Sequence, residues 1–253
     1  MELIKVSHLK KIFHKQSIAA VNDVSFSIFK GEVLGLVGES GCGKTTLSRS
    51  ILRLIDVEGG SVIYKNEDLL KVPRRKMLKM RKDLQMIFQD PHMSLDPRMN
   101  IERAIEEVYI IHDNIPRQER RRKVAGLLDV VGLDRSYLKR LPSELSGGER
   151  QRVGIARALA TGPEFIICDE PVSNLDISIQ AQILNLLIEL QKKKHLTYLF
   201  ISHDLEVIAS ICDRVAVMQA GRFVEMGPCE EIFKNPKHEY TKTLLEADKF
   251  CYV

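Results

Sequence analysis

The sequence predicts an α/β protein with a largely parallel sheet and an inserted, mostly helical subdomain. Three observations predict this fold class. Short continuous apolar runs recur along the chain, each beside a segment with helical spacing, as expected of parallel strands covered on both faces. A glycine-rich stretch follows the run at residues 33–37, where a helix is expected to begin. Residues 92–145 are rich in charge and helical spacing and show no convincing strand.

The N-terminal elements are predicted from alternation and turn residues. Leu3–Val6 and Val21–Ile28 have the apolar spacing of strands. Lys30–Glu32 is typical of a turn. The apolar run Val33–Val37 predicts a buried strand, and Lys44–Leu54 predicts the helix that follows it.

The later elements continue the same pattern. Apolar runs at Leu84–Phe88, Phe165–Cys168 and Tyr198–Ile201 predict further buried strands beside helices. Near the C-terminus, Arg214–Met218 and Phe223–Met226 flank a turn-like tetrapeptide and predict a hairpin.

We predict one domain over residues 1–253. Residues 1–91 and 146–227 are expected to form the α/β core with its antiparallel part. Residues 92–145 are expected to form the helical subdomain, and residues 228–253 a short C-terminal tail made of two helices.

The composition excludes several classes of protein. The chain has 253 residues, of which 44% are hydrophobic and 28% charged, as in an ordinary globular protein. No stretch approaches the roughly 18 apolar residues of a membrane-spanning helix, and the N-terminus lacks the layout of a secretory signal. The five cysteines form no Cys-x-x-Cys pair, which disfavours zinc ribbons and disulfide frameworks and favours a cytoplasmic setting. The net charge of +4 permits an anionic partner without requiring one.

The glycine-rich stretch matches the phosphate-loop pattern G-x-x-x-x-G-K-[ST] at every fixed position. Its glycines let successive backbone N–H groups point at phosphate oxygens, and the helix that follows adds the positive end of its dipole. Lys44 can reach the β- and γ-phosphates, and the Thr45 hydroxyl can coordinate Mg²⁺. The predicted nucleotide-binding residues are Gly38, Glu39, Ser40, Gly41, Cys42, Gly43, Lys44, Thr45 and Thr46.

Two acids end the apolar run Phe165–Cys168. Ligands of open α/β sheets bind at the carboxyl ends of strands, so Asp169 is expected beside the phosphate loop, where it can hold Mg²⁺ through water. Glu170 leaves the line of the strand and is free to polarise an attacking water. Two such acids alone are often a solvated turn, but the phosphate loop favours the catalytic interpretation.

The stretch Leu145–Arg152 predicts a helix start, with Ser146 as N-cap and Glu149 completing a capping box. Capping does not explain Gly147 and Gly148, which weaken a helix by about 1 kcal/mol each relative to alanine. A nest of backbone N–H groups that meets a phosphate would explain them. Because one phosphate loop is already present, we expect this nest to bind nucleotide held by another copy or a homologous partner.

Together these motifs resemble those of ATP-binding-cassette (ABC) ATPases over nearly the whole chain. The sequence also matches the family's glutamine switch at Gln89, the loop Ser173–Asp176 and the histidine switch at His203. The resemblance implies a P-loop NTPase core with a mostly parallel sheet, an N-terminal antiparallel β subdomain and an inserted α-helical subdomain. It also implies ATP hydrolysis with ATP and Mg²⁺ as cofactors.

The resemblance implies a role for each matching residue. Glu170 is the expected general base, and His203 contacts the γ-phosphate and the attacking water. Gln89 senses the γ-phosphate. Phe13 is expected to stack on adenine, although an apolar residue in an N-terminal strand is usually part of the core. The implied magnesium ligands are Thr45, Gln89 and Asp169.

A head-to-tail dimer is also implied. Ser146, Gly147 and Gly148 would close over ATP bound by the opposite subunit, and Asp176 would communicate between the two subunits. The second ATPase subunit would be a paralogue or a second copy of this chain.

Two segments resemble importer ATPases. Gln89–Met99 is similar to a segment of ATPase subunits from oligopeptide, dipeptide and nickel importers, and Asn235–Leu245 is similar to their C-terminal ending. The resemblance implies an ATPase that powers import of peptides, or of nickel or metal chelates, from the cytoplasmic face of the membrane. Its further partners would be two membrane permeases and, indirectly, an extracytoplasmic substrate-binding protein.

Two other interpretations stay open. The basic runs Lys71–Lys82 and Arg120–Lys123 could grip phosphates in a nucleic-acid-associated ATPase, although such runs are more often solvated helix faces. No nucleic acid is expected, because the coiled-coil insertions or second cassettes of such relatives do not fit in 253 residues. An export cassette is disfavoured by the importer-like segment.

Overall fold

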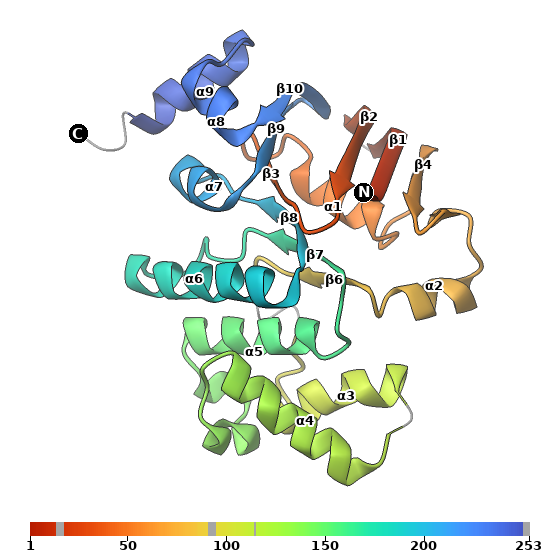
Figure 1. The fold of residues 1–253 in the computed structure, drawn as a ribbon, viewed down its shortest axis with the longest axis vertical. Coiled ribbons are helices and arrows are strands. Elements are labelled where there is room, and N and C mark those ends of the chain that lie inside the picture. Colours follow the sequence, from red (N-terminus) through yellow and green to blue (C-terminus); the bar gives the residue numbers. More distant parts are fainter. Residues whose placement is uncertain (14–17, 91–94, 114, 250–253) are drawn as a thin grey trace. The chain divides into compact units, whose positions relative to one another are not determined.

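The computed structural model describes residues 1–13, 18–90, 95–113 and 115–249. Residues 91–94 of the importer-like segment and 250–253 of the tail therefore lie outside the described residues. The chain forms two compact units: Met1–Met77 with the chain from Thr197 onward, and Leu78–Leu196 (Figure 1). Within the described ranges, no helix is both long and apolar enough to cross a membrane.

The first unit contains an antiparallel sheet in the strand order β2-β1-β4-β5. Its strands are β1 (Glu2–Phe13), β2 (Ile18–Phe29), β4 (Gly59–Tyr64) and β5 (Glu67–Asp68). Apolar side chains such as Ile4 and Val24 form its buried face, which accounts for the alternation in the sequence. β1 and β2 confirm the predicted strands. β4 and β5 were not predicted, because β4 begins with two glycines and β5 has only two residues.

Four strands of a second sheet belong to the same unit, in the order β10-β9-β3-β8. They are β3 (Val33–Val37), β8 (Thr197–Ile201), β9 (Arg214–Gln219) and β10 (Arg222–Pro228). β3 pairs in parallel with β8 and β9, whereas β9 and β10 form the predicted antiparallel hairpin. Every residue of β3 and β8 is buried, as expected of strands covered on both faces.

Helices follow these strands. They are α1 (Lys44–Ile51), α7 (Leu205–Ile211), α8 (Cys229–Lys234) and α9 (Glu239–Lys249). The predicted helix pair in the tail is confirmed, and α8 and α9 both contact β10 (Figure 1). α1 ends before the predicted Leu54, because Arg53 takes a left-handed φ of 50° and donates to the carbonyl oxygens of Leu69 and Val72 at 3.0 and 2.6 Å.

The second unit combines two parallel strands with helices. Strands β6 (Leu84–Ile87) and β7 (Phe165–Asp169) pair in parallel, so their carboxyl ends lie at one edge. The helices are α3 (Ile101–His112), α4 (Arg117–Val130), α5 (Gly147–Leu159) and α6 (Ile177–Lys194). Two 3₁₀ turns, Arg135–Lys139 and Pro142–Glu144, connect α4 to α5, and α2 (Arg74–Met80) spans the position where the units divide.

The predicted helical segment is confirmed in its secondary structure. From residue 95 to 145, Asn114 aside, the chain forms helices and turns without a strand. The apolar residues at helical spacing face inward, since Ile101, Ala104 and Ile105 of α3 are buried, as are Val124 and Leu128 of α4.

Candidate functional site

The phosphate loop connects β3 to α1 in the first unit, and its glycines are required by its backbone. Gly38, Gly41 and Gly43 have φ values of 148°, 82° and 115°, which L side chains rarely adopt. A Cβ at Gly38 would lie 2.2 Å from the carbonyl oxygen of Met218, and one at Gly43 would lie 2.0 Å from that of Ala20. No larger residue fits at either position without moving the backbone.

Lys44 places its ammonium group inside this loop. Its side chain is buried, and Nζ donates to the carbonyl oxygens of Gly38 at 2.6 Å and Glu39 at 3.0 Å. Thr45 and Thr46 lie half-buried in the first turn of α1, which carries no acidic residue. A cation and a helix N-terminus at one glycine-rich loop form a site suited to phosphate groups.

Cys42 is neutral within the loop. Burial raises the pKa of its thiol, so the thiol stays protonated at neutral pH. Glu39, Ser40 and Gly41 of the loop are exposed. The positive charge of Lys44 is therefore not offset by a thiolate from Cys42.

Gln89 and Glu170 meet in the second unit. Each follows one of the paired strands β6 and β7, and Gln89 Nε2 donates to Glu170 Oε2 at 2.9 Å. Asp169 is the last residue of β7 and is buried, whereas Glu170 turns out of the strand with a φ of 46°. This left-handed conformation is uncommon in a residue other than glycine.

The chemistry of the predicted magnesium ligands fits the ion. The Thr45 hydroxyl, the Gln89 amide and the Asp169 carboxylate all offer oxygen, the donor that Mg²⁺ prefers. Across the described part of the chain, no three His, Cys, Asp or Glu side chains are grouped as a metal site. Mg²⁺ usually keeps several waters and binds substrate phosphates.

The predicted capping box at the start of α5 is confirmed. The Ser146 N–H donates to Glu149 Oε2 at 2.7 Å, and the Glu149 N–H donates to Ser146 Oγ at 3.4 Å. Tyr137, which the sequence analysis did not single out, donates from its hydroxyl to Glu149 Oε1 at 2.5 Å. This bond and the Ser146 N–H lower the pKa of Glu149, so the carboxylate that orders the cap stays ionised.

Gly147 and Gly148 also have a packing role that the sequence did not reveal. A Cβ at Gly148 would lie 2.5 Å from Ile179 Cγ2, and one at Gly147 would lie 3.1 Å from Leu175 Cδ2. The two glycines therefore allow the start of α5 to approach the start of α6. Asp176, the exposed N-cap of α6, lies in the same segment between Leu175 and Ile179.

Phe13 and His203 are both exposed, although each could have been an ordinary core residue. Phe13 ends β1 with 42% of its surface exposed, and Lys11 Nζ lies 5.4 Å from the centre of its ring. His203 lies between Ser202 and Asp204, the N-cap of α7, and the Asp204 N–H donates to Ser202 Oγ at 3.0 Å. A core position is excluded for both side chains.

The candidate residues are thus divided between the units. The first unit carries Phe13, the loop from Gly38 to Thr46, and His203; the second carries Gln89, Asp169, Glu170, Asp176 and Ser146–Gly148. Within the second unit, the structure brings Gln89 to Glu170 and the two glycines to the start of α6.

Comparison with known proteins assigns the family. The sequence profile described as ABC transporter matches residues 21–173, more than half of the chain. The chain belongs to the ABC transporter family. This membership and the observed α/β architecture confirm the resemblance that the motifs indicated.

Relatives within the family are named for peptide transport. The oligopeptide transport ATP-binding protein OppF of Bacillus subtilis (strain 168) is 51% identical over 250 residues, which cover 97% of this chain and 82% of that protein. The dipeptide transport ATP-binding protein DppF of Lactococcus lactis subsp. cremoris (strain MG1363) is 43% identical, with coverage of 97% and 81%.

Solved ABC structures share the fold. A dimeric ATP-binding cassette in a post-hydrolysis state, bound to ADP and Pi, has a TM-score of 0.81 at 27% identity, covering 90% of this chain and 99% of its own. The cbiO1 protein of Clostridium perfringens, part of the transporter complex cbiONQ, has a TM-score of 0.82 at 26% identity, with coverage of 100% and 99%.

The basic runs that suggested nucleic acid make ion pairs within the protein. In the first run, Lys76 pairs with Glu67 at 2.7 Å. In the second run, Arg120 pairs with the buried Glu106 at 2.8 Å and also donates to the carbonyl oxygen of Ile115. Further ion pairs in these runs involve Lys71, Lys82, Arg121 and Lys123. These pairs account for much of the clustering without an external anion.

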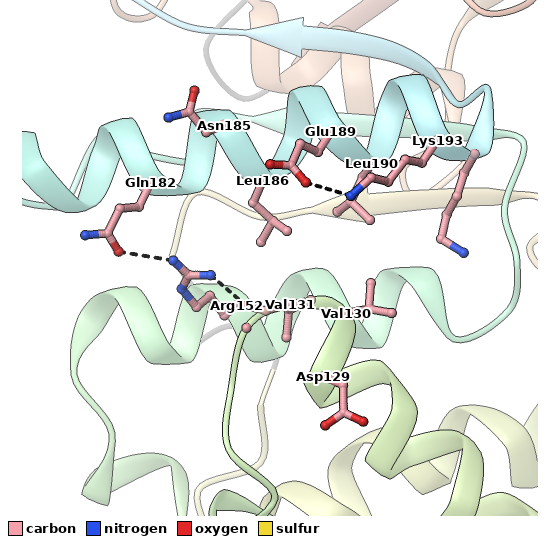
Figure 2. A pocket seen from close by; sticks show the side chains of 12 residues that line it. Asp129, Val130, Val131, Arg152, Gln182, Asn185, Leu186, Glu189, Leu190 and Lys193 are labelled. Carbon is pink, nitrogen blue, oxygen red and sulfur yellow. Dashed lines mark hydrogen bonds and ion pairs between the residues drawn. The ribbon is translucent and has the colours of Figure 1, made fainter.

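A separate pocket of about 720 Å³ lies in the second unit, between α6 and the C-terminal end of α4 (Figure 2). Leu186 and Leu190 of α6 line it. Arg152 is engaged there, donating to the carbonyl oxygen of Val131 at 2.6 Å and to Gln182 Oε1 at 3.1 Å. None of the candidate nucleotide-site residues lines this pocket.

Proposed function

We propose that this chain is the ATP-binding subunit of an ABC importer and hydrolyses ATP to drive the uptake of peptides. The observation that carries the proposal is the glycine-rich loop with the buried Lys44 ammonium inside it. The hydrogen-bonded Gln89–Glu170 pair and membership of the ABC transporter family support it.

The loop from Gly38 to Thr46 binds the phosphates of ATP. Lys44 supplies positive charge to the β- and γ-phosphates, and the backbone N–H groups at the start of α1 donate to phosphate oxygens. The exposed ring of Phe13 stacks on adenine, which buries the apolar faces of both rings.

Thr45, Gln89 and Asp169 would hold Mg²⁺ through oxygen ligands. When bound, this ion supplies positive charge that polarises the phosphate oxygens. Gln89 also orders the Glu170 carboxylate, through the bond between their side chains.

Glu170 acts as the general base for the attacking water. Its φ of 46° turns it out of the strand that Asp169 ends, so the two carboxylates serve different purposes. His203, exposed at the end of β8, contacts the γ-phosphate and this water.

The functional unit is a head-to-tail dimer of ATPase subunits, formed with a paralogue or with a second copy of this chain. Ser146, Gly147 and Gly148 close over ATP of the opposite subunit, and the exposed Asp176 communicates between the subunits. Two membrane permeases and an extracytoplasmic binding protein complete the transporter, with this chain at the cytoplasmic face of the membrane. Loss of the bonds to the γ-phosphate after hydrolysis lets the pair reopen.

Peptides are the proposed cargo. The reason is that relatives named for oligopeptide and dipeptide transport align with this chain over most of their own length. The test is to reconstitute the ATPase with its permeases in vesicles and to measure ATP turnover. A binding protein loaded with an oligopeptide is expected to stimulate turnover. Stimulation by a nickel-loaded or metal-chelate-loaded protein, and not by the peptide-loaded one, would contradict the cargo assignment.

A further inference from the structure

The C-terminal tail makes a direct hydrogen bond to the phosphate loop. The Glu39 N–H donates to the hydroxyl oxygen of Tyr240 on α9 at 3.0 Å, although 201 residues separate the two in the sequence. Both residues belong to the first unit. The importer-like ending Asn235–Leu245 therefore contains a residue that contacts the phosphate loop.

This bond acts on the part of the loop that shapes the site. Glu39 directly follows Gly38, whose φ of 148° turns the chain out of β3. The carbonyl oxygen of Glu39 accepts a hydrogen bond from Lys44 Nζ at 3.0 Å. The amide of Glu39 is thus bonded to Tyr240 and its carbonyl to Lys44, so a shift of Glu39 would move one of the groups that hold the ammonium.

The tail is itself fixed in place. Both oxygens of Glu225, on β10, accept backbone hydrogen bonds from the tail, one from Lys237 at 2.8 Å and one from His238 at 3.0 Å. Burial alone would raise the pKa of Glu225, but the hydrogen bonds that it accepts lower it, so the carboxylate stays ionised. Figure 1 shows α9 on the side of β10, where Tyr240 is only 9% exposed.

We propose that Tyr240 is a positioning residue for the phosphate loop, holding Glu39 and through it Lys44 in the arrangement that receives ATP. The proposal rests on the proposed function, that this loop binds ATP. Tyr240 acts through Glu39 and does not itself touch the phosphates. In this proposal the tail packs on β10 and also holds the nucleotide site in position.

The test compares Tyr240→Phe with Thr243→Val in the full chain. Tyr240→Phe removes one hydroxyl and keeps the buried ring. Thr243→Val removes a hydroxyl of the same helix, which donates to the Glu239 carbonyl oxygen in the preceding turn at 3.1 Å. Two quantities are measured on folded protein: the Kd of a fluorescent ATP analogue and the hydrogen-exchange rate of the Glu39 amide without nucleotide.

We expect Tyr240→Phe to raise the Kd by about 3- to 10-fold and to speed exchange of the Glu39 amide by a similar factor, the usual weight of one hydrogen bond. Thr243→Val should leave both within about 2-fold. A general loss of stability would lower the folded fraction without changing the Kd of the folded protein. The exchange rate of the Glu39 amide can also be measured in the unmodified protein alone. If that amide is not protected from exchange in the unmodified protein, the proposal is overturned.

The two proposals fail differently. If the unmodified protein binds the analogue and Tyr240→Phe changes only one of the two quantities, or neither, the positioning role is wrong. If the unmodified protein binds no nucleotide, the proposed function is wrong. Faster exchange at Glu39 in Tyr240→Phe would then still establish the bond between tail and loop.

Discussion

Gln89 donates from Nε2 to Glu170 Oε2 over 2.9 Å, across a separation of 81 residues in the sequence. The parallel pairing of β6 and β7 produces this contact, because each residue follows one of the two strands. The side chain that is expected to sense the γ-phosphate thus holds the carboxylate that is expected to activate water.

Glu170→Gln removes the proposed base while keeping the size of the side chain and one oxygen that can accept from Gln89. We expect ATP hydrolysis to fall by about 10²- to 10⁴-fold, because general base catalysis contributes about that much. Nucleotide binding should persist. Steady-state turnover and the Kd of ATP measure the two effects, with Glu189→Gln on the surface of α6 as the matched control. Normal turnover in Glu170→Gln would remove Glu170 from the reaction.

Lys44→Ala removes the ammonium group from the phosphate loop. We expect the affinity for ATP to fall by about 10- to 100-fold, since a hydrogen bond to a charged group contributes about 1.5–3 kcal/mol. Equilibrium binding measures this change. Lys30→Ala, which removes an exposed lysine in the turn between β2 and β3, should bind ATP as the unmodified protein does. Equal affinity in Lys44→Ala and Lys30→Ala would contradict the phosphate-loop assignment.

Gly148→Ala tests the close packing at the start of α5. The added Cβ would lie 2.5 Å from Ile179 Cγ2, so we expect a loss of about 1–3 kcal/mol in the free energy of unfolding. Gly126→Ala in α4 is the control, because nothing lies within 4 Å of its Cβ. In a helix interior, that change should stabilise by about 1 kcal/mol. Chemical denaturation compares them, and a stabilised Gly148→Ala would show that the contact does not restrict this position.

Tyr137→Phe tests the network at the cap of α5. The Tyr137 hydroxyl is the main cause of the lowered pKa of Glu149. A carboxyl group whose pKa is lower in the folded protein than the ordinary value near 4.3 stabilises the folded state at pH values above 4.3. This contribution to the free energy of unfolding disappears as the pH falls through the pKa of the folded state. We therefore expect Tyr137→Phe to be less stable than the unmodified protein at pH 7, with a difference that shrinks below about pH 4.

Denaturant unfolding at pH 7 and at acidic pH measures this difference. Tyr109→Phe, on α3, is the control, since its hydroxyl is not among the causes of the lowered pKa of Glu149. A difference for Tyr137→Phe that is the same at both pH values would show that the Glu149 charge is not involved.

Features that depend on residues close together in the chain could be predicted from the sequence. The phosphate loop needs a strand, glycines with positive φ and a helix in succession, and β3, Gly38, Gly43 and α1 supply them within one short stretch. The capping box joins Ser146 and Glu149, three residues apart, so its residue types predicted its bonds. Apolar runs likewise predicted the buried strands.

Contacts between segments far apart in the chain depend on the fold and could not be predicted from the sequence. No local pattern indicates that Tyr240 meets Glu39, that Gly148 lies against Ile179, or that Gln89 bonds Glu170. Each of these contacts depends on which strands pair and on which helices cover them. The spacing of apolar residues in a helix or strand indicates which face is buried. It does not indicate which residues of other elements pack against that face.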